Sequence, residues 1–254
     1  MSFFCPLASG SKGNASILSL AGKKILIDAG ISVKQLEEKL AGFDLALDQL
    51  DAIFITHEHM DHIAGLKTLS NKYDLPIICN SDTAKGIMDT LHIETNFKLF
   101  TTNEAFDFFD LRVFPFTILH DTLDPVAFKI SYKDIHLAIC TDLGFATSFV
   151  INQLHGCNYY YLEANHEVSM VHACSRPQVY KTRVLGRQGH LSNDQTCELL
   201  KTFDHRQIKK IYLAHLSDEC NAKEAALRKV TSVLTDFVDV DIAHQHKISN
   251  PLIF

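Results

Sequence analysis

Short apolar runs separated by turn-forming residues dominate the first 140 positions of the chain. Residues 15–20 and 24–28 flank an Ala-Gly break, and these two runs predict a pair of neighbouring strands. Residues 51–56 form an apolar run that predicts a buried strand, and residues 63–73, closed off before Pro76, predict a helix. Further strands are expected at residues 76–79, 99–101, 105–109, 111–119, 127–131 and 136–140, and a helix capped by Ser81 is expected to reach Thr90.

The second half of the chain alternates between helical and extended patterns. Helices are expected at residues 145–155, 192–203 (capped by Ser192) and 222–234, and strands at residues 159–163 and 211–214. Two runs of strands, each accompanied by helices, fit an α/β fold with two facing sheets between outer helices, an αββα sandwich. We expect residues 1–254 to form one such domain, although periodicity alone does not select this arrangement among α/β folds.

Composition narrows the class of protein and its surroundings. Apolar residues make up 46% of the 254 positions and charged residues 21%, as in ordinary globular proteins, and no apolar run is long enough to cross a bilayer. The first residues lack the basic segment of a signal peptide, so a cytoplasmic location is expected. Seven cysteines, an odd number without a CxxC pair, predict neither a disulfide framework nor a zinc knuckle. The net charge of −6 excludes a broadly basic nucleic-acid-binding surface and leaves only a local patch.

The segment from Thr56 to His62 concentrates metal-binding side chains directly after a predicted buried strand. It reads Thr-His-Glu-His-Met-Asp-His, with three imidazoles and two carboxylates. His57 and His59 are two positions apart, so an extended backbone projects them to one side, while Asp61 and His62 follow where the next helix begins. Mixed nitrogen and oxygen ligands suit zinc, manganese or iron. The alternative, a polar loop with incidental histidines, does not account for this density.

The HxHxDH pattern resembles the metallo-β-lactamase superfamily, in which further ligands stand at the ends of later strands. Taken singly, His120, Asp142 and His215 are ordinary polar residues at predicted strand ends, but their order matches the superfamily. The resemblance implies two divalent ions, zinc or manganese, whose shared hydroxide attacks the substrate. It assigns His57, His59 and His120 to one ion, Asp61, His62 and His215 to the other, and Asp142 to both, with Asp61 also catalytic and Asp28 bracing the ligand loop.

Longer motifs are similar to the YycJ/WalJ-type members of this superfamily, described as 5′-to-3′ DNA exonucleases. The similarity covers almost the whole chain and rests on residues 9–14, 162–166, 185–193 and 216–221. It implies a metal-dependent phosphodiester hydrolase that acts on DNA. Within these motifs, Asn14 is expected to contact substrate, and Glu163 and His166 are expected to support the site from behind.

A second set of residues is expected to hold the phosphate. His190 lies two positions before Ser192, which is expected to cap a helix, and helix N-termini bind anions. We therefore expect His190 to protonate the leaving oxygen, and Ser192 and Asn193 to hold the scissile phosphate. An exposed cap with an incidental histidine is the alternative. The preceding residues carry a local basic concentration, expected to contact the DNA backbone unless it is a solvated loop: Arg176, Lys181, Arg183 and Arg187.

Other functions are compatible with the same fold, because the fold alone does not determine the substrate. A small-molecule phosphodiesterase and an ester, lactone or thioester hydrolase are the main alternatives. A di-iron protein of this superfamily would replace the second motif histidine with glutamate, whereas His59 stands here. The complete ligand set disfavours a binding protein without catalysis. No long insertion for clamping nucleic acid is expected between Asp142 and His215, and nothing in the sequence indicates the oligomeric state.

Overall fold

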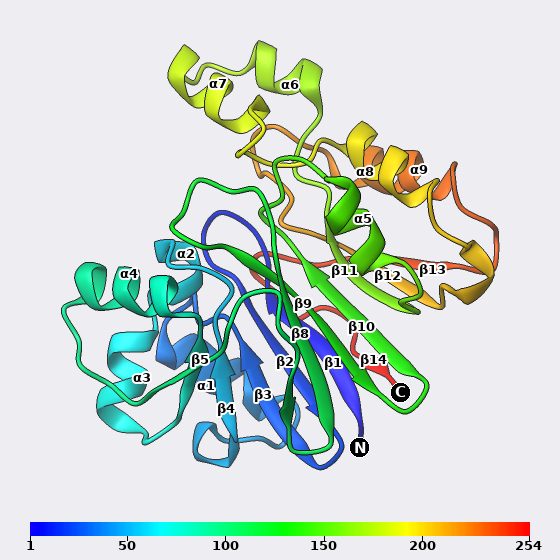
Figure 1. Ribbon diagram of the computed structural model, residues 1–254. Helices are drawn as coiled ribbons and strands as arrows, with labels where there is room; N and C mark the ends of the chain where they lie inside the picture. Colours follow the sequence, from blue (N-terminus) through cyan, green and yellow to red (C-terminus); the bar gives the residue numbers. More distant parts are fainter.

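Two seven-stranded sheets face each other between two layers of helices in the computed structural model, which describes residues 1–254 (Figure 1). The first sheet has the order β14-β1-β2-β3-β4-β5-β6. Its strands are β1 (Phe3–Ala8), β2 (Ala15–Leu20), β3 (Lys23–Ile27), β4 (Ala52–Phe54), β5 (Ile77–Cys79), β6 (Phe97–Leu99) and β14 (Leu252–Ile253).

The second sheet has the order β13-β12-β11-β10-β9-β8-β7. Strands β10, β11, β12 and β13 are parallel neighbours, whereas β9 runs antiparallel to both β8 and β10. The strands are β7 (Phe106–Phe108), β8 (Leu111–Thr117), β9 (Val126–Tyr132), β10 (Ile135–Cys140), β11 (Tyr159–Glu163), β12 (Lys210–Ala214) and β13 (Asp239–Ile242).

Three apolar clusters correspond to the three interfaces between these four layers. The middle cluster lies between the sheets, where Phe54 of the first sheet packs on Phe128 of the second. One outer cluster joins the first sheet to α1 (Val33–Ala41), α2 (Met60–Ile63), α3 (Leu66–Lys72) and α4 (Ser81–Leu91). The other joins the second sheet to α5 (Ser148–Leu154), α8 (Asn193–Leu200) and α9 (Lys223–Thr231). The central strands are therefore apolar on both faces, which explains their unbroken apolar runs.

One end of the sandwich gathers the polar strand ends. The carboxyl ends of β3, β4, β8, β10, β11 and β12 point to the same edge, because these strands share one direction within their sheets. A helical pair, α6 (Val168–Ala173) and α7 (Gln178–Leu185), projects beyond the sheets at this end (Figure 1). It rests on a small cluster of its own, in which Val171, Val184 and Cys220 are buried. None of the helices has the length and apolarity needed to cross a membrane.

The predicted αββα arrangement is confirmed, with corrections in detail. The helix expected at residues 63–73 is two helices, interrupted at Gly65, where a side chain would collide with the carbonyl oxygen of Ile31. Helix α4 is capped by Asn80, whose side chain accepts from the amide of Thr83, and Ser81 is its first helical residue. The strand expected at residues 99–101 lies two positions earlier, and β1, β13, β14, α1, α6 and α7 were not predicted.

Candidate metal centre

The ligand loop, residues 57–62, begins three residues after the end of β4 and ends inside α2. His57 and His59 precede the helix, and Asp61 and His62 belong to its first turn, so the change from extended to helical backbone aims the two pairs at different points. His57 and His62 are buried, whereas His59 and Asp61 are partly exposed toward a cleft. The local fold therefore produces the divergent arrangement that the sequence predicts.

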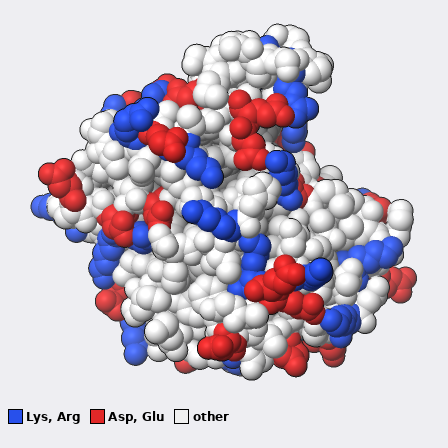
Figure 2. Space-filling view, turned by 180° about the vertical axis from the view of Figure 1, so that it is seen from behind, with Lys and Arg blue, Asp and Glu red and all other residues white.

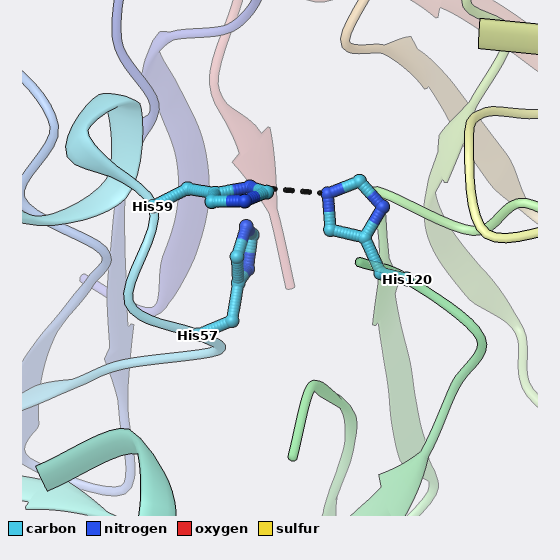
Figure 3. A group of neighbouring side chains, drawn as sticks. All are labelled: His57, His59 and His120. Carbon is cyan, nitrogen blue, oxygen red and sulfur yellow. Dashed lines mark hydrogen bonds between the residues drawn. The ribbon is translucent and has the colours of Figure 1, made fainter. Parts of the chain in front are cut away.

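His57, His59 and His120 form the first ligand group (Figure 3). The three rings converge although His120 comes from the second sheet, after β8, and His59 Nδ1 lies 3.2 Å from His120 Nε2. Two nitrogens bound to one zinc at about 2.0–2.1 Å in tetrahedral geometry lie about 3.3 Å apart. Burial lowers the pKa of all three imidazoles, with a smaller contribution from neighbouring histidines, and the pKa of His59 falls to about 4. The rings are therefore neutral at pH 7 and have lone pairs available for a metal.

Asp61, His62 and His215 form the second ligand group, and Asp142 lies with His57 and His62 in an overlapping set. His62 Nε2 lies 3.3 Å from Asp142 Oδ2, and His215 Nε2 lies 3.5 Å from Asp61 Oδ2. Burial lowers the pKa of His215, but Asp142, Asp61 and Glu163 outweigh burial and raise it to about 10. The carboxylates thus give this end of the cleft a negative potential that attracts cations.

Three buried polar atoms at the centre have no hydrogen-bond partner: His57 Nε2, Asp142 Oδ2 and His215 Nε2. Buried polar groups are rarely left unpaired, because their desolvation is then uncompensated. His57 is a predicted ligand of the first ion and His215 of the second, and Asp142 is predicted to contact both ions. Together with the donor set of imidazoles and carboxylates, they fit divalent metal binding.

Backbone strain marks three residues at the sheet edge. Asp28, Asp142 and His215 follow β3, β10 and β12, and their φ angles are 58°, 60° and 53°. Non-glycine residues seldom adopt this left-handed conformation, and they persist there only where the surroundings fix them. The sharp turn at each strand end holds the side chain at the edge of the sheet, where the ligands meet.

Asp28 and Asn14 brace the ligand loop. Asp28 accepts hydrogen bonds from the amide and hydroxyl of Thr56, and its Oδ2 lies 2.8 Å from His62 Nδ1. Nε2 of His62 therefore faces the ligand group, where it also lies 3.0 Å from Asn14 Nδ2. Asn14 is 3% exposed and donates to both the carbonyl and a carboxylate oxygen of Asp61. Asn14 therefore lies behind Asp61 and does not line the cleft, although a contact with substrate was predicted for it.

Glu163 links two histidines from beneath the cleft. Its Oε2 accepts from the amides of Leu143 and Leu191, and its Oε1 lies 2.8 Å from His190 Nδ1 and 3.1 Å from His215 Nδ1. Burial raises the pKa of Glu163, but His190 and His215 outweigh burial and lower it to about 2. An ionised carboxylate at this position requires both imidazoles to present Nδ1–H, which leaves Nε2 of each ring for other partners.

His190 lines the cleft together with ligands of both groups. Its ring centroid lies 5.2 Å from that of His120 and 5.1 Å from that of His215. His166, by contrast, is 1% exposed and contacts the side chain of Asn165, and burial lowers its pKa to about 4. His166 is thus a neutral residue beneath the site, whereas His190 lines the cleft.

Ser192 and Asn193 do not line the cleft. Ser192 is 2% exposed and caps α8 by accepting from the amide of Gln195, which confirms the predicted cap. Asn193 is fully buried and donates to Glu167 and Asn221. Both side chains are committed to structural hydrogen bonds, so their burial does not support the expected contact with phosphate.

The expected basic segment is helix α7 with its flanking residues, and its arginines have partners. Arg176 forms an ion pair with Glu219, Arg183 with Asp121, and the guanidinium of Arg187 lies 3.9 Å from the centre of the Phe145 ring. Of these arginines, Arg183 alone lines the cleft. Acidic and basic side chains also intermingle over the face in Figure 2, without an extended surface of one sign. This face therefore offers no extended basic surface for a DNA backbone.

Two residues of the site were missed in the sequence. Asp121 directly follows the ligand His120, and its Oδ1 lies 3.7 Å from His59 Nε2; its position beside a predicted ligand was a usable signal. Tyr180, on α7, lines the cleft with Ser11, Asn165 and Ser217. Nothing local in the sequence distinguishes Tyr180 from a surface tyrosine, because its role depends on how α7 folds back over the metal centre.

Comparisons with known proteins agree with this geometry. The model of the beta-lactamase superfamily domain matches residues 23–216. Exodeoxyribonuclease YycJ of Bacillus anthracis is 34% identical over 235 residues, 92% of this chain and 89% of that protein. Exodeoxyribonuclease WalJ of Streptococcus pneumoniae serotype 2 (strain D39) is 35% identical over 225 residues, 87% and 83% of the two chains.

A solved structure shares the architecture. The metallo-beta-lactamase fold protein YhfI of Bacillus subtilis superposes with a TM-score of 0.75 at 16% identity, over 98% of this chain and 99% of that one. The predicted fold and the predicted metal-dependent hydrolase are thus confirmed. The chain belongs to the beta-lactamase superfamily and, within it, to the family of the YycJ and WalJ exodeoxyribonucleases.

Proposed function

We propose that the protein is a 5′-to-3′ DNA exonuclease that uses two divalent cations, zinc or manganese. The observation that carries this proposal is the meeting of a complete ligand set and a carboxylate-bound histidine in one cleft. The DNA substrate rests on the similarity to the YycJ and WalJ exodeoxyribonucleases. The direction of cleavage is what the motif resemblance at residues 9–14, 162–166, 185–193 and 216–221 implies. The bound cations would supply a nucleophile from water at neutral pH and neutralise charge on the phosphate.

The ligands would divide between two positions. His57, His59 and His120 would hold one cation, Asp61, His62 and His215 the other, and Asp142, between the groups, would contact both. Asp61 has a further role, because its partly exposed carboxylate lines the cleft and can accept a proton from the attacking water. Asn14 keeps that carboxylate in place through its hydrogen bond to Oδ2.

His190 would protonate the leaving oxygen. The hydrogen bond from its Nδ1 to Glu163 fixes the ring, so that Nε2 can donate a proton toward the cleft. When a phosphodiester is cleaved, the departing alkoxide is a strong base and needs this proton. A thioesterase would release a thiolate, which leaves readily without an acid, so the Glu163–His190 pair favours phosphodiester cleavage over the thioester alternative.

Two further features bear on the domain organisation of the enzyme and on its location in the cell. We propose that residues 1–254 act as a single catalytic unit, because one buried cluster joins both sheets behind the site. We also propose a cytoplasmic location, since all seven cysteines are unpaired, as in proteins kept in a reducing compartment.

The proposal can be tested with linear DNA labelled at either end. The chelated protein is reloaded with zinc, manganese or magnesium and incubated with single- and double-stranded DNA and with RNA. A 5′-to-3′ exonuclease releases a 5′ label at once as mononucleotide, whereas a 3′ label remains on fragments that shorten progressively; His190→Ala serves as the inactive control. Early release of the 3′ label would contradict the direction, and turnover of esters without turnover of DNA would favour the rival class.

A further inference from the structure

The metal centre lies at the bottom of a small cleft with walls from several segments. The cleft has a volume of about 170 Å³, whereas pockets that enclose a drug-sized ligand usually measure about 300–1,000 Å³. Tyr180, Arg183 and Val184 of α7 form one wall, and Ser11 and Ser217 belong to loops on other sides. A single phosphate with its nearest sugar is a more suitable occupant than a long stretch of strand.

An ion pair joins Arg183, which lines the cleft, to Asp121. Arg183 Nη2 donates to Asp121 Oδ1 at 3.0 Å, and Nε donates to Oδ2, so the planar guanidinium is bound in two places. Asp121 Oδ1 also lies 3.5 Å from His120 Nε2 and 3.7 Å from His59 Nε2. The pair thus joins α7 to the loop after β8 directly beside the first ligand group.

Another ion pair lies beside the second ligand group. Lys12 Nζ lies 2.7 Å from Asp218 Oδ2, and this contact joins the glycine-rich loop after β1 to the loop that follows His215. The neighbours of the two charged residues, Ser11 and Ser217, line the cleft. The cleft is therefore bounded by linked loops at both of its ends.

An internal phosphodiester and a terminal one make different demands on such a cleft. A strand bound at an internal phosphate must leave the metal centre in two directions, whereas a strand bound at its end leaves in one. Building on the proposed exonuclease function, we propose that the Asp121–Arg183 ion pair blocks one of these exits and thereby restricts cleavage to DNA ends. Asp121 and Arg183 are then specificity-determining residues that separate exonuclease from endonuclease activity.

The packing of α7 holds Arg183 in this position. The neighbouring Val184 is 3% exposed and belongs to the cluster that anchors the helical pair, and Asp121 is fixed through the adjacent ligand His120. Because Asp121 offsets its charge, Arg183 is not a free cation at the surface. A closing role therefore fits the contacts of Arg183 better than the general backbone grip expected from the sequence.

The test compares circular and linear single-stranded DNA of one sequence, because a circle has no end. Wild-type protein with manganese should degrade the linear form and leave the circle intact. Arg183→Ala should raise nicking of the circle relative to digestion of the linear form by about 10–100-fold, the factor expected when a charge-assisted hydrogen bond no longer has to be broken. Arg206→Ala is the matched control, since Arg206 forms a similar two-point pair with Asp204 outside the cleft; its ratio should equal that of wild type.

Hydrolysis of bis(p-nitrophenyl) phosphate by each variant normalises the rates to the amount of intact metal centre. A conservative variant, Arg183→Lys, keeps the charge but not the two-point geometry and should give an intermediate ratio. An unchanged ratio in Arg183→Ala, with both rates reduced equally, would mean that Arg183 only binds DNA and would overturn the inference. Nicking of circles by wild-type protein would also overturn it. Failure of wild type on linear DNA would instead refute the proposed function itself, and the inference with it.

Discussion

Replacement of Glu163 by glutamine tests whether His190 delivers a proton to the leaving oxygen. The glutamine carbonyl can still accept the hydrogen bonds from the amides of Leu143 and Leu191. Its NH₂ group would then face His190 Nδ1 and His215 Nδ1, which both donate to Glu163 in the wild-type protein. The ring of His190 must either change tautomer or move, and its protonated form loses its counter-charge.

The size of the effect follows from the hydrogen bond that is lost. A hydrogen bond to a charged group contributes about 1.5–3 kcal/mol, which corresponds to a factor of about 10–100 in rate. We therefore expect Glu163→Gln to slow DNA cleavage by about 10–100-fold, and His190→Ala, which removes the acid entirely, by about 10²–10⁴-fold.

The assay compares two leaving groups on the same metal centre. A thymidine dinucleotide releases an alkoxide and needs the acid, whereas thymidine 5′-p-nitrophenyl phosphate releases a nitrophenolate and does not. Both variants should lose far more activity on the dinucleotide, and elemental analysis should show unchanged metal content although His215 also contacts Glu163. Equal losses on the two substrates at full metal content would refute the proton-transfer role.

Three further predictions concern the metal centre and its support. Asp142→Ala should remove the carboxylate shared by the two ligand groups, lower the metal content and abolish turnover; full activity in EDTA would contradict this. Gly30→Ala should destabilise the fold by at least about 1–3 kcal/mol, because the new Cβ would lie 1.6 Å from the carbonyl oxygen of Asp61; an unchanged urea midpoint would argue otherwise. In the metal-free protein, the pKa of Glu163 is lowered from 4.5 to about 2, so the stability that its ionised form contributes is present above pH 4.5 and is lost as the pH falls toward 2. Urea titrations of wild type and Glu163→Gln should therefore converge at low pH, and a constant difference would show that the carboxylate charge is not responsible.

The structure brings the predicted ligands close together, and the sequence could indicate this because each of them has a local signal. His57, His59, Asp61 and His62 are nearly consecutive, and the remaining ligands stand where apolar runs end, so the direction of the strands brings them together. The polar residues around them were harder to interpret. A capping serine such as Ser192 has the same sequence pattern whether it is buried, as here, or open to a ligand.

The parts that were not predicted depend on distant contacts. The helix α7 has a single buried residue, Val184, so it shows no apolar stripe and was interpreted only as a basic segment that contacts DNA. Its position over the cleft is set by Cys220, from a segment more than thirty residues further on. Strand β1 lies between β2 and β14, and the pairing of Phe4 with Leu252 joins the two extremes of the chain. Local periodicity carries no information about such pairings.

The two ligand groups draw on both sheets, and this has a thermodynamic consequence. His57, His59 and His62 follow β4 of the first sheet, whereas His120 and His215 follow strands of the second. A cation bound by side chains of both halves is a cross-link that exists only in the folded chain. A ligand of this kind adds about 4 kcal/mol to the free energy of unfolding when its free concentration is 1,000 times its Kd. The free energy that holds the two halves together would then depend on the concentration of free metal as well as on apolar packing. Removal of the metal by a chelator would lower the free energy of unfolding, and an ample supply of metal would raise it.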